Sequence, residues 1–231
     1  MQVTALELPA RWGDVVGQLA RVDRAIASGP KTELVLLPEA SLTGYVAENG
    51  DFDLTRFSEW PDGATASRLA ELAIAHRVHM IGPLIERDRQ HVYNTMVGFD
   101  PEGRRFVRYR KRHPWYPETW ATAGAAHHPT FAIGGSLVTI AVCFDVHFLT
   151  IEASHTLAAA DVLLFPSAWV EQEDSREAML SALAREHDVA IVNANWGVGR
   201  PRIAGQGGSM VVSRRGEIVA RTIDGRVDAS L

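Results

Sequence analysis

Hydrophobic positions along the 231-residue chain change period repeatedly, from the spacing of two typical of strands to the spacing of three or four typical of helices. Apolar or alternating runs predict strands at residues 3–6, 34–39, 78–85, 95–99, 104–109, 131–133, 136–143, 162–165 and 189–193. Amphipathic runs predict helices at residues 12–26, 64–76, 151–159 and 176–187. This mixture predicts an α/β protein whose sheets are covered by helices.

Turn signals divide these runs. The sequence Asp100-Pro101-Glu102-Gly103 predicts a hairpin that delivers Lys111, and Gly134-Gly135 predicts a second hairpin that delivers Cys143. Gly82-Pro83 interrupts the strand at 78–85, and Gly29-Pro30 ends the first helix. A long loop is expected at residues 40–60, with further strand pairs around 214–216 and 224–225.

Length and composition narrow the class of protein. A chain of 231 residues that is 46% hydrophobic buries a substantial core, and we expect one domain over residues 1–231. The formal charge of −5 argues against nucleic acid or an anionic membrane as a partner. No apolar run approaches membrane-spanning length, and residues 1–7 have no basic leader, so a cytoplasmic location is expected.

Three of the strand-like runs end in residues with useful chemistry. One ends in Glu39, the next in Lys111, and the third in Cys143, which is the only cysteine of the chain. A carboxylate that accepts a proton, an ammonium that stabilises an oxyanion and a thiol that attacks carbon are together sufficient for covalent acyl transfer.

Each of these residues has a plainer interpretation when taken alone. A lone cysteine on an apolar strand is usually a small buried hydrophobe. Glu39 fits a solvated strand end, and Lys111 belongs to a basic cluster typical of a solvated hairpin face. Only the joint pattern favours catalysis.

The same residues carry a resemblance to a known family. Leu36-Leu37-Pro38-Glu39, Tyr109-Arg110-Lys111-Arg112-His113 and Val142-Cys143-Phe144-Asp145 are similar, in this order, to the acid, lysine and cysteine motifs of the nitrilase superfamily of carbon-nitrogen hydrolases. Residues 160–169, 189–195, 207–210 and 215–217 extend the likeness over nearly the whole chain. The resemblance implies a four-layer α-β-β-α sandwich and a homodimer or higher homo-oligomer.

It also implies roles for particular residues. Glu39 would take the Cys143 proton, and Lys111 with the backbone N–H of Phe144 would stabilise the oxyanion. Ammonia or an amine would leave as a thioester forms on Cys143, and water activated by Glu39 would then hydrolyse the thioester. Glu118 resembles an additional family glutamate that positions the lysine or the substrate nitrogen. Trp169 resembles a pocket position, and three further aromatic residues are candidates to line the pocket: Trp115, Tyr116 and Trp196.

Other site types are not indicated. The histidine pairs lack the partners and spacing of a zinc motif, so no metal is expected. The glycine-rich segments 197–200 and 205–208 lack the strand, loop and helix context of a nucleotide site, and no cofactor is expected. The chain departs from the family pattern at residues 148–153 and at Leu183 and His187, which flank the helix glutamate Glu186.

The sequence therefore predicts a cysteine-dependent hydrolase of the carbon–nitrogen bond in a small linear amide or N-carbamoyl compound. A true nitrilase is the nearest alternative, although that branch commonly carries Trp-Glu after the cysteine, where this chain has Phe144-Asp145. A catalytically silent binding protein of the same fold and a redox-sensing thiol protein are the alternatives from other classes.

Overall fold

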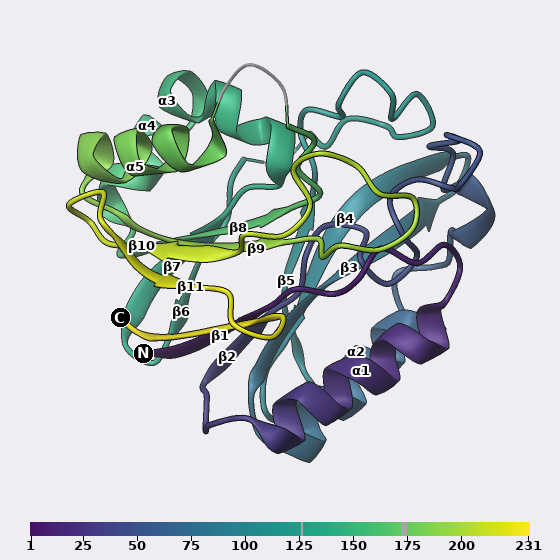
Figure 1. Ribbon diagram of the computed structural model, residues 1–231, viewed down its shortest axis with the longest axis horizontal. Helices are drawn as coiled ribbons and strands as arrows, with labels where there is room; N and C mark the ends of the chain where they lie inside the picture. The colour runs from purple at the N-terminus through teal and green to yellow at the C-terminus, as the bar shows by residue number, and fades with distance from the viewer. Residues whose placement is uncertain (126, 172–174) are drawn as a thin grey trace.

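Two six-stranded sheets lie face to face in the computed structural model, which describes residues 1–125, 127–171 and 175–231 (Figure 1). The first sheet contains, in spatial order, β12 (Arg226–Ser230), β1 (Gln2–Leu6), β2 (Leu34–Leu36), β3 (His79–Asp88), β4 (His91–Phe99) and β5 (Arg105–Arg110). The second contains β11 (Ile218–Arg221), β10 (Met210–Val212), β9 (Ala190–Asn195), β8 (Val162–Ser167), β7 (Ser136–Ile140) and β6 (Thr130–Ile133).

Helices cover the outer face of each sheet. The helices α1 (Val15–Ser28) and α2 (Ala64–His76) lie on the first sheet, and α3 (Leu149–Glu152), α4 (Ser154–Ala159) and α5 (Arg176–His187) lie on the second (Figure 1). Two 3₁₀ helices, η1 (Thr55–Phe57) and η2 (Cys143–Phe148), lie in loops. The predicted four-layer α-β-β-α sandwich is confirmed.

The central strands are apolar on both faces because both faces are covered. In β2 the side chains of Leu34 and Leu36 belong to the core shared with the second sheet, whereas Val35 and, just beyond the strand, Leu37 pack with α1 and α2. All four are completely buried. The continuous apolar run before Glu39 thus reflects a strand between two layers, and it fixes the backbone that leads to this carboxylate.

The predicted interruption of the third strand is wrong. β3 continues through Gly82 and Pro83, which pair with β4. The Leu37 N–H donates to the Ile81 carbonyl at 2.9 Å, so Ile81 and, two residues later, Pro83 direct their backbone polar groups toward β2. Because β2 ends at Leu36, the missing N–H of Pro83 removes no ladder hydrogen bond.

Three other boundaries differ from the prediction. β7 ends at Ile140, and Cys143 instead begins η2. The predicted helix 151–159 is divided at Ala153 into α3 and α4. The strands on either side of Asp224 do not pair as neighbours, since β11 belongs to the second sheet and β12 crosses to pair with β1 of the first.

The first helix also begins later than predicted. Trp12 precedes α1 and packs edge-on against Phe57, and Val16 is 82% exposed. Leu19, Val22 and Ile26 form the buried face, because residues three or four apart lie on the same side of a helix while their direct neighbours do not.

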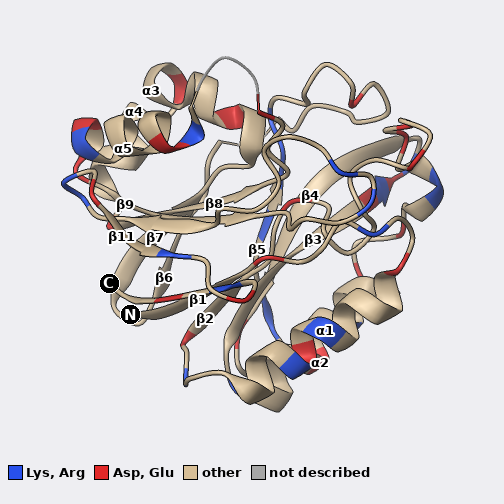
Figure 2. Ribbon diagram, in the orientation of Figure 1, with Lys and Arg blue, Asp and Glu red and all other residues tan. Residues whose placement is uncertain are grey.

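Charged residues are interspersed over the outer helices. Figure 2 shows acidic and basic segments side by side on the α1 and α2 layer and on the α5 layer, in keeping with the net charge of −5. No helix in the described part of the chain combines the length and the apolar character that crossing a bilayer requires.

Candidate active site

Cys143 lies at a sharp change of backbone direction just beyond β7. Its φ of 44° falls in the left-handed region, which few residues other than glycine occupy and which is often found where strain serves function. Asp145 holds this turn, because its carboxylate accepts hydrogen bonds from Val142 N at 3.0 Å, Tyr109 Oη at 2.8 Å and His113 N at 2.8 Å. The cysteine segment is therefore fixed to the chain on both sides of Lys111.

Lys111 follows β5 and is buried with two carboxylates. Its Nζ donates to Glu39 Oε1 at 2.7 Å and to Glu118 Oε1 and Oε2 at 3.0 and 2.9 Å. Asn94 of β4 completes the group, since its Nδ2 donates to Glu39 Oε1 at 2.8 Å and to Glu118 Oε1 at 3.1 Å. These four residues, called the carboxylate–lysine cluster below, are each no more than 2% exposed.

Backbone N–H groups hold the outer oxygens of the two carboxylates. Ala168 N donates to Glu39 Oε2 at 2.9 Å, and Trp115 N donates to Glu118 Oε2 at 2.8 Å. Glu39 Oε1 therefore accepts from both Lys111 and Asn94, whereas Oε2 has Ala168 N as its one donor among the described residues. The oxygen with an unused lone pair is the one beside Ala168, a residue that also lines the cavity around Cys143.

Burial and charge shift the titration of several groups here. Burial raises the pKa of the Cys143 thiol well above its ordinary value, and the nearby Glu39 carboxylate adds to this, while Lys111 opposes it. Burial also raises the pKa of Glu118 against the pull of Lys111. Burial acts to lower the pKa of Lys111, but the charges of Glu118 and Glu39 outweigh it, and the pKa is raised. Lys111 therefore stays charged, and the resting cysteine is a thiol.

A small cavity of about 60 Å³ opens over the sulfur of Cys143. Its lining is mostly apolar and aromatic: Trp115, Cys143, Phe144, His147, Ala168, Trp169 and Val170. His147 packs face to face with Trp169, with ring centroids 6.2 Å apart, and tilts against Phe144 at 5.0 Å. The cavity has room for only a few non-hydrogen atoms.

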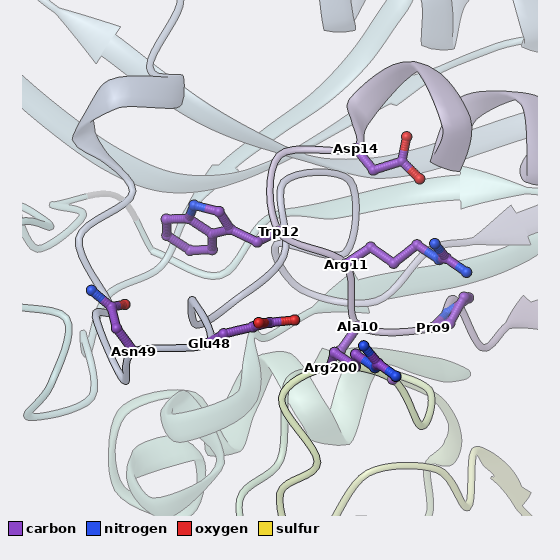
Figure 3. A pocket seen from close by; sticks show the side chains of 9 residues that line it. Pro9, Ala10, Arg11, Trp12, Asp14, Glu48, Asn49 and Arg200 are labelled. Atoms are coloured by element: carbon purple, nitrogen blue, oxygen red, sulfur yellow. The ribbon is translucent and has the colours of Figure 1, made fainter.

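A much larger groove, of about 1040 Å³, lies elsewhere on the surface. Figure 3 shows Trp12 and the charged side chains of Arg11, Asp14, Glu48 and Arg200 around it. It shares no lining residue with the cavity over Cys143 and contains no thiol. Its size therefore does not make it the site of the chemistry expected from the sequence.

The structure brings most of the predicted site residues together. Glu39, Lys111 and Glu118 are joined directly, and Cys143, Phe144, Trp115 and Trp169 line the adjacent cavity.

Two predicted pocket residues lie outside that lining. Tyr116 is 73% exposed and packs on Trp115, with ring centroids 4.6 Å apart. Trp196 is buried behind the wall of the cavity, where its Nε1 donates to the Trp169 carbonyl at 2.8 Å. Tyr116 therefore faces solvent, and Trp196 supports the pocket through Trp169.

Sequence reasoning missed three residues of the site. Asn94 lies in β4, which begins at His91, four residues before the predicted strand at 95–99; a buried amide next to apolar strand positions is the signal that could have found it. Tyr45 is buried, and its pKa is raised by burial and by the charges of Glu118, Glu39 and Cys143, yet no pattern in the sequence indicates this position. His147 required the geometry of η2.

Residues 148–153, where the chain departs from the family pattern, contact the segment that follows Lys111. Glu152 Oε2 accepts from Arg112 Nε at 3.1 Å and lies 3.0 Å from His113 Nε2, so α3 is tied to the segment that follows Lys111. Leu183 is buried in the core beneath the second sheet. Among the described residues, no group of histidine, cysteine, aspartate and glutamate side chains is arranged to hold a metal ion.

Comparisons with known proteins show which proteins the chain resembles. A family model described as carbon-nitrogen hydrolase matches residues 2–226. The chain is 26% identical over 226 residues to a 2-oxoglutaramate amidase of Bacillus subtilis, an alignment that covers 94% of this chain and 85% of the relative. It is 30% identical over 197 residues to a nitrilase of Pyrococcus abyssi, covering 84% and 73% of the two chains.

A solved structure gives the same result for the fold. An amidase from Nesterenkonia sp. superposes with a TM-score of 0.86 at 25% sequence identity, covering 100% of this chain and 90% of that chain.

Proposed function

The chain belongs to the carbon-nitrogen hydrolase family, and on this premise we propose that it is an amidase that hydrolyses a small linear amide or N-carbamoyl compound through a thioester on Cys143. The observation that carries the proposal is the buried Lys111, which binds both Glu39 and Glu118 next to a cysteine that lines a cavity. A cation, an acid–base pair and a nucleophile in one water-poor site are the requirements of acyl transfer.

The first half of the reaction transfers the acyl group to sulfur. Glu39 Oε2 takes the proton of the Cys143 thiol, and the thiolate attacks the carbonyl carbon of the amide. The backbone N–H of Phe144 and the positive charge of Lys111 stabilise the oxyanion. The proton on Glu39 then moves to the amide nitrogen, the carbon–nitrogen bond breaks, and ammonia or an amine leaves.

The second half restores the thiol. Glu39 takes a proton from water, and the resulting hydroxide attacks the thioester carbon. The carbon–sulfur bond breaks, the proton held by Glu39 moves to sulfur, and the carboxylic acid product leaves and releases its own proton to solvent. In the resting structure Lys111 donates its N–H groups to Glu39 and Glu118. It therefore stabilises the oxyanion through its positive charge and not through an N–H that is already free.

The cavity supports a small acyl group. A volume of about 60 Å³, walled by Trp115, Phe144 and Trp169, fits an acyl chain of a few carbon atoms. Among the described residues that line it there is no lysine or arginine, so a neutral, short-chain acyl group suits it best.

A panel of substrates tests the proposal. Short aliphatic amides, N-carbamoyl compounds and the matching nitriles are incubated with the protein, and ammonia release is measured. We expect hydrolysis of the short amides or carbamoyl compounds that disappears in Cys143→Ala. Absence of turnover throughout the panel, with a folded protein, would favour the silent binding protein instead.

A nitrilase is the second candidate, because a relative that is 30% identical carries that name. Both reactions use a thiol, a base and a cation, and they differ in the electrophile that the thiolate attacks. Ammonia released from a nitrile but not from the corresponding amide would select the nitrilase.

The assembly and location of the protein follow from the same proposal. We expect a homodimer in the cytoplasm, where a reducing environment keeps the free thiol reduced. Light scattering on the eluate of a size-exclusion column checks the dimer, since a monomer at micromolar concentration would contradict it.

A further inference from the structure

Asn94 contacts each of the other three residues of the carboxylate–lysine cluster. It lies on β4 and is 2% exposed. Its side-chain Nδ2 donates to Glu39 Oε1 at 2.8 Å and to Glu118 Oε1 at 3.1 Å. Its backbone carbonyl accepts from the Lys111 N–H at 2.8 Å. One residue thus contacts both carboxylates and also fixes the backbone of the lysine.

The orientation of the Asn94 amide follows from its neighbours. Two carboxylate oxygens, which both accept from Lys111, face one end of the amide. Only the NH₂ end can bind two acceptors, so Nδ2 faces Glu39 and Glu118. The other end, Oδ1, is buried and has no hydrogen-bond partner among the described residues. The carboxylates therefore determine how this side chain is held.

The charges in the cluster give the two N–H groups a function. Two carboxylates share a single cation, Lys111, and the other titratable groups that face them are the Cys143 thiol and the Tyr45 hydroxyl. Burial raises the pKa of Glu118, and the charge of Glu39 adds to this rise. Hydrogen bonds donated to a carboxylate favour its ionised form. Asn94 supplies one such bond to each carboxylate.

We propose that Asn94 is a positioning residue whose hydrogen bonds hold the Glu39 carboxylate with Oε1 occupied and Oε2 directed to take the thiol proton. The proposal rests on the proposed acid–base role of Glu39. Asn94 does not touch the reacting atoms, and it acts through the carboxylate that does. Its loss lowers activity most where the base must compete with protons, at the acid end of the pH range.

The pH dependence of kcat/KM for a short amide tests this role. In Asn94→Leu, which preserves the side-chain shape, the acid limb is expected to move to higher pH by about 1 to 2 units, with the rate at high pH within a few-fold of the wild type. Asn94→Asp places a third carboxylate against the pair, and it is expected to move the limb at least as far. If the Leu variant does not fold, the Asp variant still tests the proposal.

Thr95→Val is the matched control, because Thr95 is the next residue of β4, is equally buried, and bonds the carboxylate of Glu86 at 3.1 Å on the other face of the sheet. This variant should keep the wild-type pH profile. A uniform rate loss at all pH values in both Asn94 variants, with the limb unmoved, would overturn the proposal and leave a purely structural role.

The rate at which iodoacetamide alkylates Cys143 separates this proposal from the proposed function. It reports formation of the thiolate without turnover, so it tests Asn94 even if the wild type hydrolyses no amide. We expect alkylation of both Asn94 variants to require higher pH than alkylation of the wild type. An unchanged alkylation profile would contradict the role of Asn94, whereas a wild type without turnover contradicts only the amidase.

Discussion

The hairpin of β4 and β5 carries a charge cluster on each face of the first sheet, and each cluster contains a fully buried carboxylate. On the inner face, Asn94 and Lys111 bind Glu39 and Glu118. On the outer face, the very next side chains of each strand bind Glu86: Thr95 at 3.1 Å, and Arg110, whose Nε lies 3.1 Å from it. Glu39 and Glu86 are both fully buried, so burial of a carboxylate does not distinguish the two clusters.

The composition of the clusters does distinguish them. Arg110 also bonds Asp88 at 2.7 Å and lies over the ring of Tyr93, with Arg108 3.8 Å from Glu86. The outer cluster therefore pairs two carboxylates with two guanidinium groups, which do not release protons at physiological pH. Its charges are balanced, and it contains no thiol, since Cys143 is the only cysteine of the chain.

The inner cluster has one cation for two carboxylates, and it faces a thiol. Its groups compete for protons, as the raised pKa values of Glu118 and Cys143 indicate. A buried ion pair alone is therefore no sign of catalysis. Unequal charge, a mobile proton and a cavity over a nucleophile are what separate a reactive cluster from a structural one.

The largest expected effect is the loss of activity when Cys143 or Lys111 is replaced. Cys143→Ala and Lys111→Ala should each lower kcat/KM for a short amide by at least about 10⁴-fold, because the nucleophile or the charge that stabilises the oxyanion is gone. Ammonia release measures the activity, and circular dichroism checks that the chain remains folded. Full activity in either variant would rule out the mechanism.

The outer cluster should behave in the opposite way. Arg110→Met leaves Glu86 buried without its main cation, and we expect it to lower the free energy of unfolding by about 3–5 kcal/mol. Activity per folded molecule should stay within a few-fold of the wild type. Urea unfolding and active-site titration measure the two quantities; a loss of activity that exceeds the loss of folded protein would show that the clusters are coupled.

The Cys143 thiol, which the inner cluster faces, should also affect the free energy of unfolding at high pH. The folded-state pKa of Cys143 is raised, so above about pH 8.5 the unfolded chain has released a proton that the folded chain retains. Stability is then lost as pH rises, with a slope of up to about 1.4 kcal/mol per pH unit for this one proton. Urea midpoints between pH 7.5 and 10 should fall more steeply for the wild type than for Cys143→Ala. Parallel slopes would contradict a buried neutral thiol.

The smallest effect is expected at an exposed ion pair outside both clusters. Arg221 bonds Glu177 at 2.9 Å through Nη2, and both side chains are about half exposed. Because such pairs contribute little in water, Arg221→Ala should lower stability by less than about 1 kcal/mol and leave activity unchanged. Thermal unfolding checks this. A loss as large as that of Arg110→Met would mean that burial is not what gives the outer cluster its strength.

The layers of this fold could be predicted from the sequence because they follow from which surfaces are covered. The fully apolar run 34–37 indicates a strand between two layers, and the spacing of Leu19, Val22 and Ile26 indicates a helix with one buried face. The motif residues Glu39, Lys111 and Cys143 follow three of these elements, so their convergence could be expected from the family resemblance.

What could not be predicted depends on contacts between distant segments. Pro83 remains in a strand because β2 ends beside it, and β12 joins the first sheet through pairing with β1. The left-handed backbone of Cys143 is held by Asp145 bonds that reach His113 and Tyr109. Asn94 acquires its role only when Glu39 and Glu118 are both placed next to it.

The most direct test of the inner cluster as a reactive site is intact-protein and peptide mass spectrometry after brief incubation with short amides and rapid acid quenching. The account predicts an added acyl group on the peptide that contains Cys143, transient in the wild type and absent in Cys143→Ala. Hydrolysis that continues in Cys143→Ala, or an acyl group carried by a different residue, would contradict it.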